Sequence, residues 1–94
     1  MLQTIGSFGW AIQRMKEGAK VARRGWNGKG MFIYYVPANS YPMSGNTLET
    51  MKGIYENDLV PYQEYTAMKT ADDTVVPWLC SQSDMYAEDW EEVA

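Results

Sequence analysis

The stretch that most constrains this chain covers residues 22–32, with the sequence ARRGWNGKGMF, and an apolar run over residues 31–36 continues from it. Asn and Gly tolerate the positive φ angles of tight hairpin turns, so the pair Asn27-Gly28 predicts a hairpin between two strands. Trp26 stands beside this turn. The stretch therefore has two interpretations: a hairpin whose tryptophan packs in the core, or a ligand-binding lip of aromatic, amide and cationic groups.

Ninety-four residues predict a single domain, so residues 1–94 are expected to share one small core. The chain has four Trp, seven Tyr and two Phe, which are many rings for a core of this size. Tyr and Trp are favoured where one edge of the ring stays wet. We therefore expect some of these rings at a subunit interface or a ligand site.

The chain has no histidine and a single cysteine, Cys80. It lacks the commonest general base and metal ligand, and it cannot form an internal disulfide or a thiolate zinc site. Cys80 and Ser81 have no histidine to activate them, so no catalytic nucleophile and no cofactor are expected. No apolar run long enough to span a membrane and no signal-peptide pattern stand out, which predicts a cytoplasmic protein.

The net charge of −4 is unevenly distributed. Residues 1–32 carry six basic groups and one acid, whereas residues 33–94 carry two basic groups and eleven acids. The overall charge argues against non-specific binding to nucleic acid. The basic first third suits a small anionic ligand, although an ordinary solvated surface explains the same charges.

Hydrophobic spacing predicts a helix that begins after Ser7, as N-cap, and ends at Gly18, as C-terminal cap. Strands are expected at Lys20–Arg24 and Met31–Val36, on either side of the turn. Breaker residues are spread through residues 37–61, which are expected to form a long irregular loop. A loop of this length is usually functional or contacts a partner.

Alternating apolar positions and turn residues predict two strands, a short helix and a last strand, at Glu64–Thr70, Val75–Leu79, Gln82–Glu88 and Asp89–Val93. Pro77 donates no ladder hydrogen bond, so it places the second of these strands at an edge or a bulge. Ser81 and Asp84 form a capping-box-like start for the helix. The order of elements predicts an α+β domain: an antiparallel sheet with an N-terminal helix and a short C-terminal helix.

The adjacent carboxylates Asp72 and Asp73, and the acids over residues 88–92, fit either a divalent-metal site or a solvated surface. The solvated surface is the simpler explanation, so no metal site is expected. Gly25, Gly28 and Gly30 do not form a dinucleotide fingerprint, because they do not lie between a strand and a helix.

A group of aromatic and polar side chains remains that suits an anionic aromatic ligand: Arg24, Trp26, Asn27, Lys29, Thr74, Gln82 and Asp84. Trp26 can stack on a base, and Asn27 can hydrogen-bond a base or a ribose. Arg24 or Lys29 can bind phosphate. The residues alone predict a small, oligomeric α+β domain that binds such a ligand, and they predict nothing more specific.

Two sequence blocks resemble the signatures of one small phage and prophage family, the second type of Thoeris anti-defence protein, formerly a domain of unknown function. They are AKVARRGWNGKGMF at residues 19–32 and MKTADDTVVPWLCSQSD at residues 68–84, and the ending AEDW at residues 87–90 resembles the family too. The resemblance leaves residues 37–62 without support. Two blocks in the right order and at the right separation are more specific than either glycine turn alone.

The resemblance implies a sponge rather than an enzyme. Members of the family bind glycocyclic ADP-ribose, a cyclic ADP-ribose isomer that Thoeris TIR proteins make during phage infection, and they sequester it without degrading it. The effector then stays inactive. Members are homo-oligomers, typically homotetramers, that act in the host cytoplasm. Some relatives also bind cyclic oligonucleotides at a separate site. The resemblance implies no nucleic-acid or membrane partner.

The resemblance carries the ligand contacts onto both blocks and the first helix: Phe8, Trp26, Asn27, Gly28, Asp72, Thr74, Trp78, Gln82 and Asp84. Phe8 is included because it is expected on the first helical turn. Many relatives have Asp-Gly-Thr where this chain has an aspartate, Asp73, in the middle position. The conformation of this turn is therefore the point at which the chain departs from the family.

Two other functions fit the same residues. One is a metal-dependent phosphodiesterase of a nucleotide signal, which would use Asp72, Asp73 or the C-terminal acids. The other is an inhibitor that binds a host protein directly through its aromatic surface.

Overall fold

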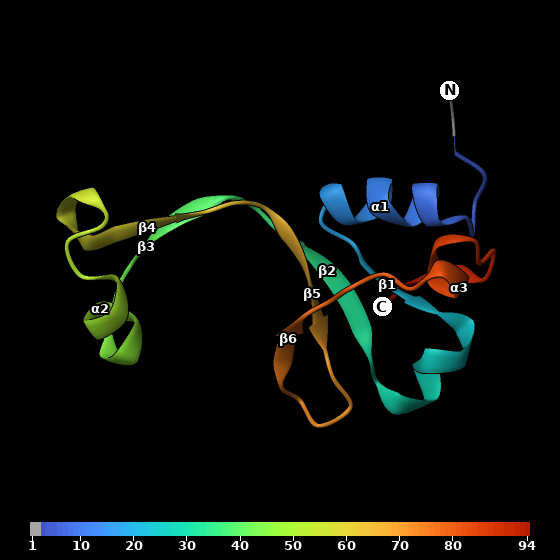
Figure 1. Ribbon diagram of the computed structural model, residues 1–94. Coiled ribbons are helices and arrows are strands. Elements are labelled where there is room, and N and C mark those ends of the chain that lie inside the picture. Colours follow the sequence, from blue (N-terminus) through green and yellow to red (C-terminus); the bar gives the residue numbers. More distant parts are fainter. Residues whose placement is uncertain (1–2) are drawn as a thin grey trace.

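The computed structural model describes residues 3–94, apart from the side chain of Asn27 and the surroundings of Gly28. It consists of a body and a projecting arm, residues 37–64 (Figure 1). The body is an antiparallel five-stranded sheet in the order β6 (Val75–Pro77), β5 (Tyr65–Lys69), β2 (Phe32–Val36), β1 (Lys20–Arg23) and β7 (Trp90–Val93). Helices α1 (Phe8–Lys16) and α3 (Gln82–Met85) complete it. The predicted α+β class is confirmed.

Helix α1 lies where the apolar spacing predicts it. Ser7 is its N-cap, and the backbone N–H of Trp10 donates to the Ser7 hydroxyl over 3.2 Å. At the other end Gly18 has a φ of 98°, and the N–H of Ala19 donates to the carbonyl of Arg14 over 3.0 Å. Both ends are therefore closed by the residues that the sequence indicates.

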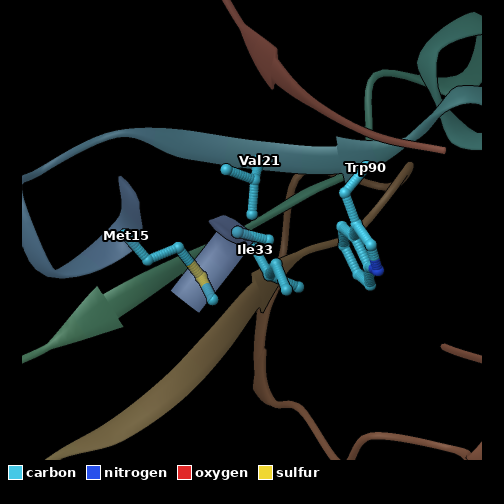
Figure 2. Packing of buried hydrophobic residues seen from close by; sticks show 5 residues of the cluster. Met15, Val21, Ile33 and Trp90 are labelled. Atoms are coloured by element: carbon cyan, nitrogen blue, oxygen red, sulfur yellow. The ribbon is translucent and has the colours of Figure 1, made fainter. Parts of the chain in front are cut away.

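The core lies between α1 and the sheet (Figure 2). Ala11 and Met15 of α1 meet Val21, Ile33 and Trp90 of three strands, and none of these five residues is more than 4% exposed. Val21 and Ile33 are directly paired across β1 and β2, so their side chains share one face of the sheet. Full burial of an aliphatic side chain of this size contributes about 1.5–3 kcal/mol. The core thus joins elements from both ends of the chain.

The connection between β1 and β2 differs from the predicted tight hairpin turn. Residues Arg24–Lys29 form a 3-10 helix, η1, and Gly30, with a φ of 67°, leads the chain towards β2. The reason is Trp26, whose ring packs edge-on against Trp90 with the ring centroids 5.3 Å apart. The burial of this large ring outweighs the local preference of the Asn-Gly pair for a two-residue turn.

The arm replaces the irregular loop that was predicted over residues 37–61. β3 (Asn39–Pro42) pairs with β4 (Leu59–Tyr62), and helix α2 (Gly45–Met51) and the short 3-10 helix η2 (Glu56–Asp58) lie between them at the tip (Figure 1). The prediction was wrong because it took proline as a strand breaker. Both strands of a two-stranded ribbon are edge strands. Each has one side without a partner strand, and a proline on that side costs the sheet no hydrogen bond.

The second half of the chain follows the predicted order with shorter elements. β6 is an edge strand, as its proline predicts, and Ser81 and Asp84 form the predicted capping box of α3. Helix α3 ends before the predicted Glu88. At this end the carbonyl of Asp84 accepts from the Ala87 N–H over 3.4 Å and from the Trp90 indole N–H over 3.0 Å. Across residues 3–94, no helix is long and apolar enough to cross a membrane.

Candidate ligand-binding site

Four aromatic side chains from distant parts of the chain form an aromatic cluster: Phe8 on α1, Trp26 on η1, Trp78 after β6 and Trp90 on β7. Phe8 lies with its ring centroid 6.1 Å from that of Trp78 and 5.4 Å from that of Trp90. Trp26 stands edge-on to Trp78 at 6.1 Å. Tilted and edge-on pairs at these distances are favourable beyond their buried area. The fold thus brings together three predicted ligand contacts and adds Trp90.

A hollow of about 300 Å³ opens beside the cluster. We call it the aromatic hollow, and its walls are Phe8, Ile12, Met15, Lys16, Tyr35, Glu64, Tyr65, Thr66, Trp78 and Cys80. Most of these groups are apolar or aromatic, and one cation and one carboxylate are among them. A mainly apolar concave site with a few polar groups is typical of small-molecule sites.

The Tyr35 hydroxyl donates a hydrogen bond to the Glu64 carboxylate in the wall of the aromatic hollow. This bond and, to a smaller extent, desolvation raise the pKa of Tyr35 above its ordinary value. The contact lies where the arm leaves the body, because Tyr35 is on β2 and Glu64 comes directly before β5. The hollow is therefore next to the root of the arm.

Trp26 is half-buried and is not in the wall of the hollow. Its ring supports Trp78 and Trp90 from another side, so the core interpretation of this tryptophan is correct for much of the ring. Arg24 and Lys29 of the same 3-10 helix are exposed. The predictions for Asn27 and Gly28 lie outside the described residues.

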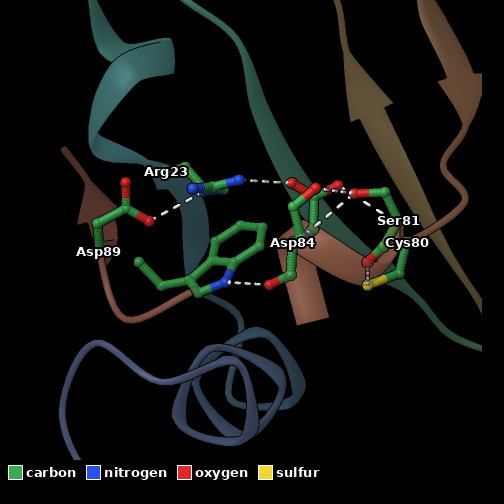
Figure 3. A network of polar contacts seen from close by, with 7 residues as sticks. Arg23, Cys80, Ser81, Asp84 and Asp89 are labelled. Atoms are coloured by element: carbon green, nitrogen blue, oxygen red, sulfur yellow. Dashed lines mark hydrogen bonds and ion pairs between the residues drawn. The ribbon is translucent and has the colours of Figure 1, made fainter. Parts of the chain in front are cut away.

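Arg23 connects three elements near the cluster (Figure 3). Its Nε donates to the Asp89 carboxylate over 2.9 Å, and its Nη1 donates to Asp84 over 3.1 Å. The Ser81 N–H donates to the same Asp84 carboxylate over 3.3 Å, and the Asp84 N–H donates back to the Ser81 hydroxyl over 3.1 Å. Since the Asp84 carbonyl also accepts from the Trp90 indole, this network holds α3 against β1 and the aromatic cluster.

The Asp84 carboxylate is charged and already bonded in this arrangement. Its burial raises the pKa, but the hydrogen bonds from Ser81 and Arg23 outweigh that effect and leave the pKa below its ordinary value. The side chain is only 14% exposed. Its geometry suits a residue that supports the site from behind, and a direct ligand contact stays a prediction. Gln82, on the same helix, is exposed.

The β5–β6 turn lies apart from the hollow within one chain. Asp72 and Thr74 precede β6 and are exposed, whereas Trp78 follows that strand. The Thr74 and Thr70 hydroxyls hydrogen-bond over 2.7 Å. The structure therefore does not bring these two predicted contacts to the aromatic hollow of their own chain.

Asp73 takes the conformation that a glycine favours, with a φ of 62°. Its carboxylate pairs with the Lys69 ammonium over 2.6 Å, and Lys69 also donates to the carbonyl of Gly30 over 3.1 Å. Aspartate tolerates this left-handed region better than most residues. The turn is therefore closed with aspartate in the middle position, and Lys69 connects it to the end of the η1 segment.

A model of the Thoeris anti-defense 2-like domain matches residues 6–93. The chain belongs to this family. A relative named Thoeris anti-defense 2, from Bacillus phage SP01, is 36% identical over 93 residues, which are 99% of this chain and 100% of the relative. Both matches extend across the arm, so the segment over residues 37–62, which the two sequence blocks left unsupported, is part of the family domain.

Two residues around the cluster were missed from the sequence. Trp90 was predicted within the last strand and the ending AEDW but was not assigned to the site, although its place in an alternating strand was a signal that it faces the core. Arg23 was treated as one of several basic groups, and nothing in its neighbours along the chain indicates its partners 61 and 66 residues away. Among the described residues, no three acidic or cysteine side chains gather to hold a metal ion.

Proposed function

We propose that this protein counters the Thoeris defence by binding a cyclic ADP-ribose-type signal, glycocyclic ADP-ribose, and sequestering it without degradation. Membership of the Thoeris anti-defence 2-like family supports the anti-defence class. The observation that carries the ligand proposal is the aromatic hollow, where Phe8 and Trp78 face a concave space beside Lys16. A base, a ribose and phosphates are the three chemical parts that such a site must accommodate.

In this proposal the adenine ring enters the aromatic hollow and contacts Phe8 and Trp78. Stacking of a base on an aromatic side chain contributes about 1–3 kcal/mol. Lys16, in the wall, is the nearest cation for a phosphate, and the Thr66 hydroxyl is available for a ribose. The chain needs no catalytic group for this function, since a sponge acts through affinity and slow release.

The hollow alone is at the small end of the ligand-site range, which begins at about 300 Å³. We therefore propose a homo-oligomer, a tetramer by resemblance to the family, in which a neighbouring subunit completes the site. The exposed Arg24, Gln82, Asp72 and Thr74 are then available to a ligand bound across subunits. The same proposal places the protein in the host cytoplasm.

A second hollow, of about 350 Å³, is the place to test for the cyclic oligonucleotides that the resemblance implies. Phe32 and Tyr34 line it together with Lys20 and Lys69. Met15 of α1, and Gly18 and Ala19 after it, also line this hollow, so it lies beside the C-terminal end of α1. Aromatic faces with two ammonium groups suit a nucleotide.

The test is recovery of the signal. The protein is incubated with the purified signal, free ligand is removed, the complex is heated, and the released compound is analysed by mass spectrometry. Intact signal in stoichiometric amount is the expected result. A degraded product whose formation a chelator suppresses would instead indicate the phosphodiesterase. No bound signal, together with capture of one host protein, would indicate the direct inhibitor.

Two variants make this test specific for the site. Trp78→Ala removes a wall of the aromatic hollow and is expected to lower the recovered signal at least tenfold. Tyr86→Ala removes an exposed ring outside the hollow and is expected to leave recovery unchanged. Equal losses in both variants would place the ligand elsewhere on the protein.

A further inference from the structure

Three side chains form a row across the sheet on one side of the aromatic hollow. Tyr35 of β2 is paired directly with Thr66 of β5, and the N–H of Trp78, the residue after β6, donates to the Thr66 carbonyl over 2.9 Å. All three line the hollow, and Tyr35 and Trp78 pack against the core beneath α1. The row therefore lies on the sheet face that α1 covers, with Thr66 between two rings.

Glu64 adds a carboxylate beside this row. It directly precedes β5, two positions before Thr66, and both residues line the hollow. The Tyr35 hydroxyl donates to Oε2 of the Glu64 carboxylate, and among residues 3–94 no hydrogen bond reaches the other oxygen, Oε1. An ionised carboxylate accepts hydrogen bonds but cannot donate them. Oε1 therefore offers a ligand an acceptor whose orientation is fixed through Tyr35.

The hollow holds one charge of each sign. Among the described residues of its wall, Lys16 of α1 is the cation and Glu64, at the root of the arm, is the carboxylate. A phosphate is attracted by the ammonium group and repelled by the carboxylate. The part of an anionic ligand that fits beside Glu64 is therefore an uncharged hydrogen-bond donor. In dinucleotide-binding domains a carboxylate takes this role towards the 2′-hydroxyl of a ribose, whereas an arginine accommodates a 2′-phosphate.

The spacing of the row brings a ribose to Glu64 once a base lies on Trp78, as in the proposed function. Adjacent strands of a sheet are about 4.8 Å apart, so Thr66 is one such step from Trp78 and Tyr35 is two steps away. A ribose is bonded directly to its base, so it lies over the next position of the row, where Thr66 and Glu64 are. The 5′-phosphate beyond the ribose is then left to Lys16 on the α1 side.

We propose that Glu64 determines the ligand specificity of the hollow: its carboxylate accepts a hydrogen bond from the 2′-hydroxyl of the base-bearing ribose and rejects a 2′-phosphate. Tyr35 is a positioning residue, because its hydroxyl orients that carboxylate and acts on the ligand through it. The inference rests on the proposed function and deepens it. The class of ligand that it names is the adenine nucleotide with a free 2′-hydroxyl.

Three small nucleotides test this assignment without the cyclic signal. AMP, 2′-deoxy-AMP and adenosine 2′,5′-bisphosphate have the same base and 5′-phosphate and differ only at the 2′ position of the sugar. Their dissociation constants are measured by NMR titration of the full-length protein. AMP is expected to bind about tenfold more tightly than the bisphosphate, which adds a repelled charge, and about fivefold more tightly than 2′-deoxy-AMP, which loses a hydrogen bond to a charged group. Equal binding of all three, or no binding of AMP at millimolar concentration, would overturn the proposal.

Glu64→Gln removes the charge while keeping the size of the side chain. The preference for AMP over the bisphosphate is expected to fall about tenfold in this variant. Glu56→Gln is the matched control: it makes the same charge change at an exposed acid of the arm outside the hollow, and the preference is expected to stay. An unchanged preference in Glu64→Gln, or an equal change in both variants, would overturn the proposal. So would an equal loss of AMP and 2′-deoxy-AMP binding, which would mean that Glu64 contacts the amine of the base.

Tyr35→Phe tests the positioning role. It is expected to reduce the same preference about threefold in the otherwise native protein and to leave it unchanged in Glu64→Gln, because the hydroxyl acts through the carboxylate. A uniform weakening of all three nucleotides would show a merely structural Tyr35 and overturn its positioning role. Recovery of the intact signal is measured separately on the native protein. Intact signal without the expected 2′ preference overturns this inference alone, whereas the absence of both overturns the proposed function as well.

Discussion

The indole N–H of Trp90 donates to the backbone carbonyl of Asp84 over 3.0 Å. This bond joins the end of α3 to the ring of Trp90, which belongs to the aromatic cluster. The Asp84 side chain meanwhile accepts from Arg23 over 3.1 Å. One residue therefore connects the last strand, the short helix and β1, and the wall of the aromatic hollow depends on that connection.

Asp84→Asn is expected to destabilise the protein at neutral pH and to lose this effect in acid. The folded-state pKa of Asp84 is lowered, so the unfolded state takes up the proton first as pH falls. The stability from the charged group is complete above the unfolded-state pKa of about 3.9 and is lost as pH falls through the folded-state value. Chemical denaturation at pH 7 and in steps below pH 4 (on the order of one pH unit each) measures this.

Asp72→Asn is the matched control for that series, because Asp72 is exposed and outside the Arg23 network. A difference between wild type and Asp84→Asn that grows as the solution becomes more acidic would contradict the assigned network.

Trp26→Ala is expected to weaken both folding and ligand binding, because the ring supports Trp78 rather than only facing a ligand. Truncation of a large aromatic side chain in a packed position costs about 3–5 kcal/mol, and the partial exposure of Trp26 places it near the lower value. Trp26→Phe is expected to keep the fold. Calorimetric melting and ligand titration on both variants separate the two effects, and an unchanged melting temperature in Trp26→Ala would contradict the supporting role.

Gly6→Ala is expected to destabilise the protein by about 2 kcal/mol or more. Gly6 has a φ of 95°, and an added Cβ would lie 2.6 Å from the carbonyl oxygen of Glu88. The clash falls where the carbonyl of Gly6 accepts from the Trp90 N–H. Gly25→Ala is the control, since an added Cβ there meets no heavy atom within 4 Å. Equal unfolding free energies for the two variants would refute this close approach.

Asp73→Gly is expected to change stability by less than about 1 kcal/mol. Glycine relieves the positive φ of 62°, while the variant loses the ion pair to Lys69. That ion pair is worth little because the Asp73 side chain is 81% exposed. Asp73→Val loses the ion pair to Lys69 and also introduces a β-branched residue, which is strained at a positive φ. It is therefore expected to be less stable than Asp73→Gly in urea titrations.

The candidate site was predicted in part. The sequence named Phe8, Trp26 and Trp78, and the fold brings these rings together with Trp90. The same prediction placed Thr74 with them, but β6 separates that residue from the hollow. Motif blocks identify residues that belong together in a family, whereas the distance between them depends on how the strands run.

The amino-acid sequence by itself determined the features whose partners lie within a few positions. The Ser7 cap, the Ser81–Asp84 capping box and the edge position of Pro77 are of this kind, because each depends on one backbone conformation and its nearest hydrogen bonds. Only the tertiary structure decided that Trp26 turns into the cluster and that residues 37–64 form an arm. Burial of a ring and pairing of a ribbon depend on contacts with segments that are remote in the sequence. A local sequence pattern does not contain the free energy of these contacts.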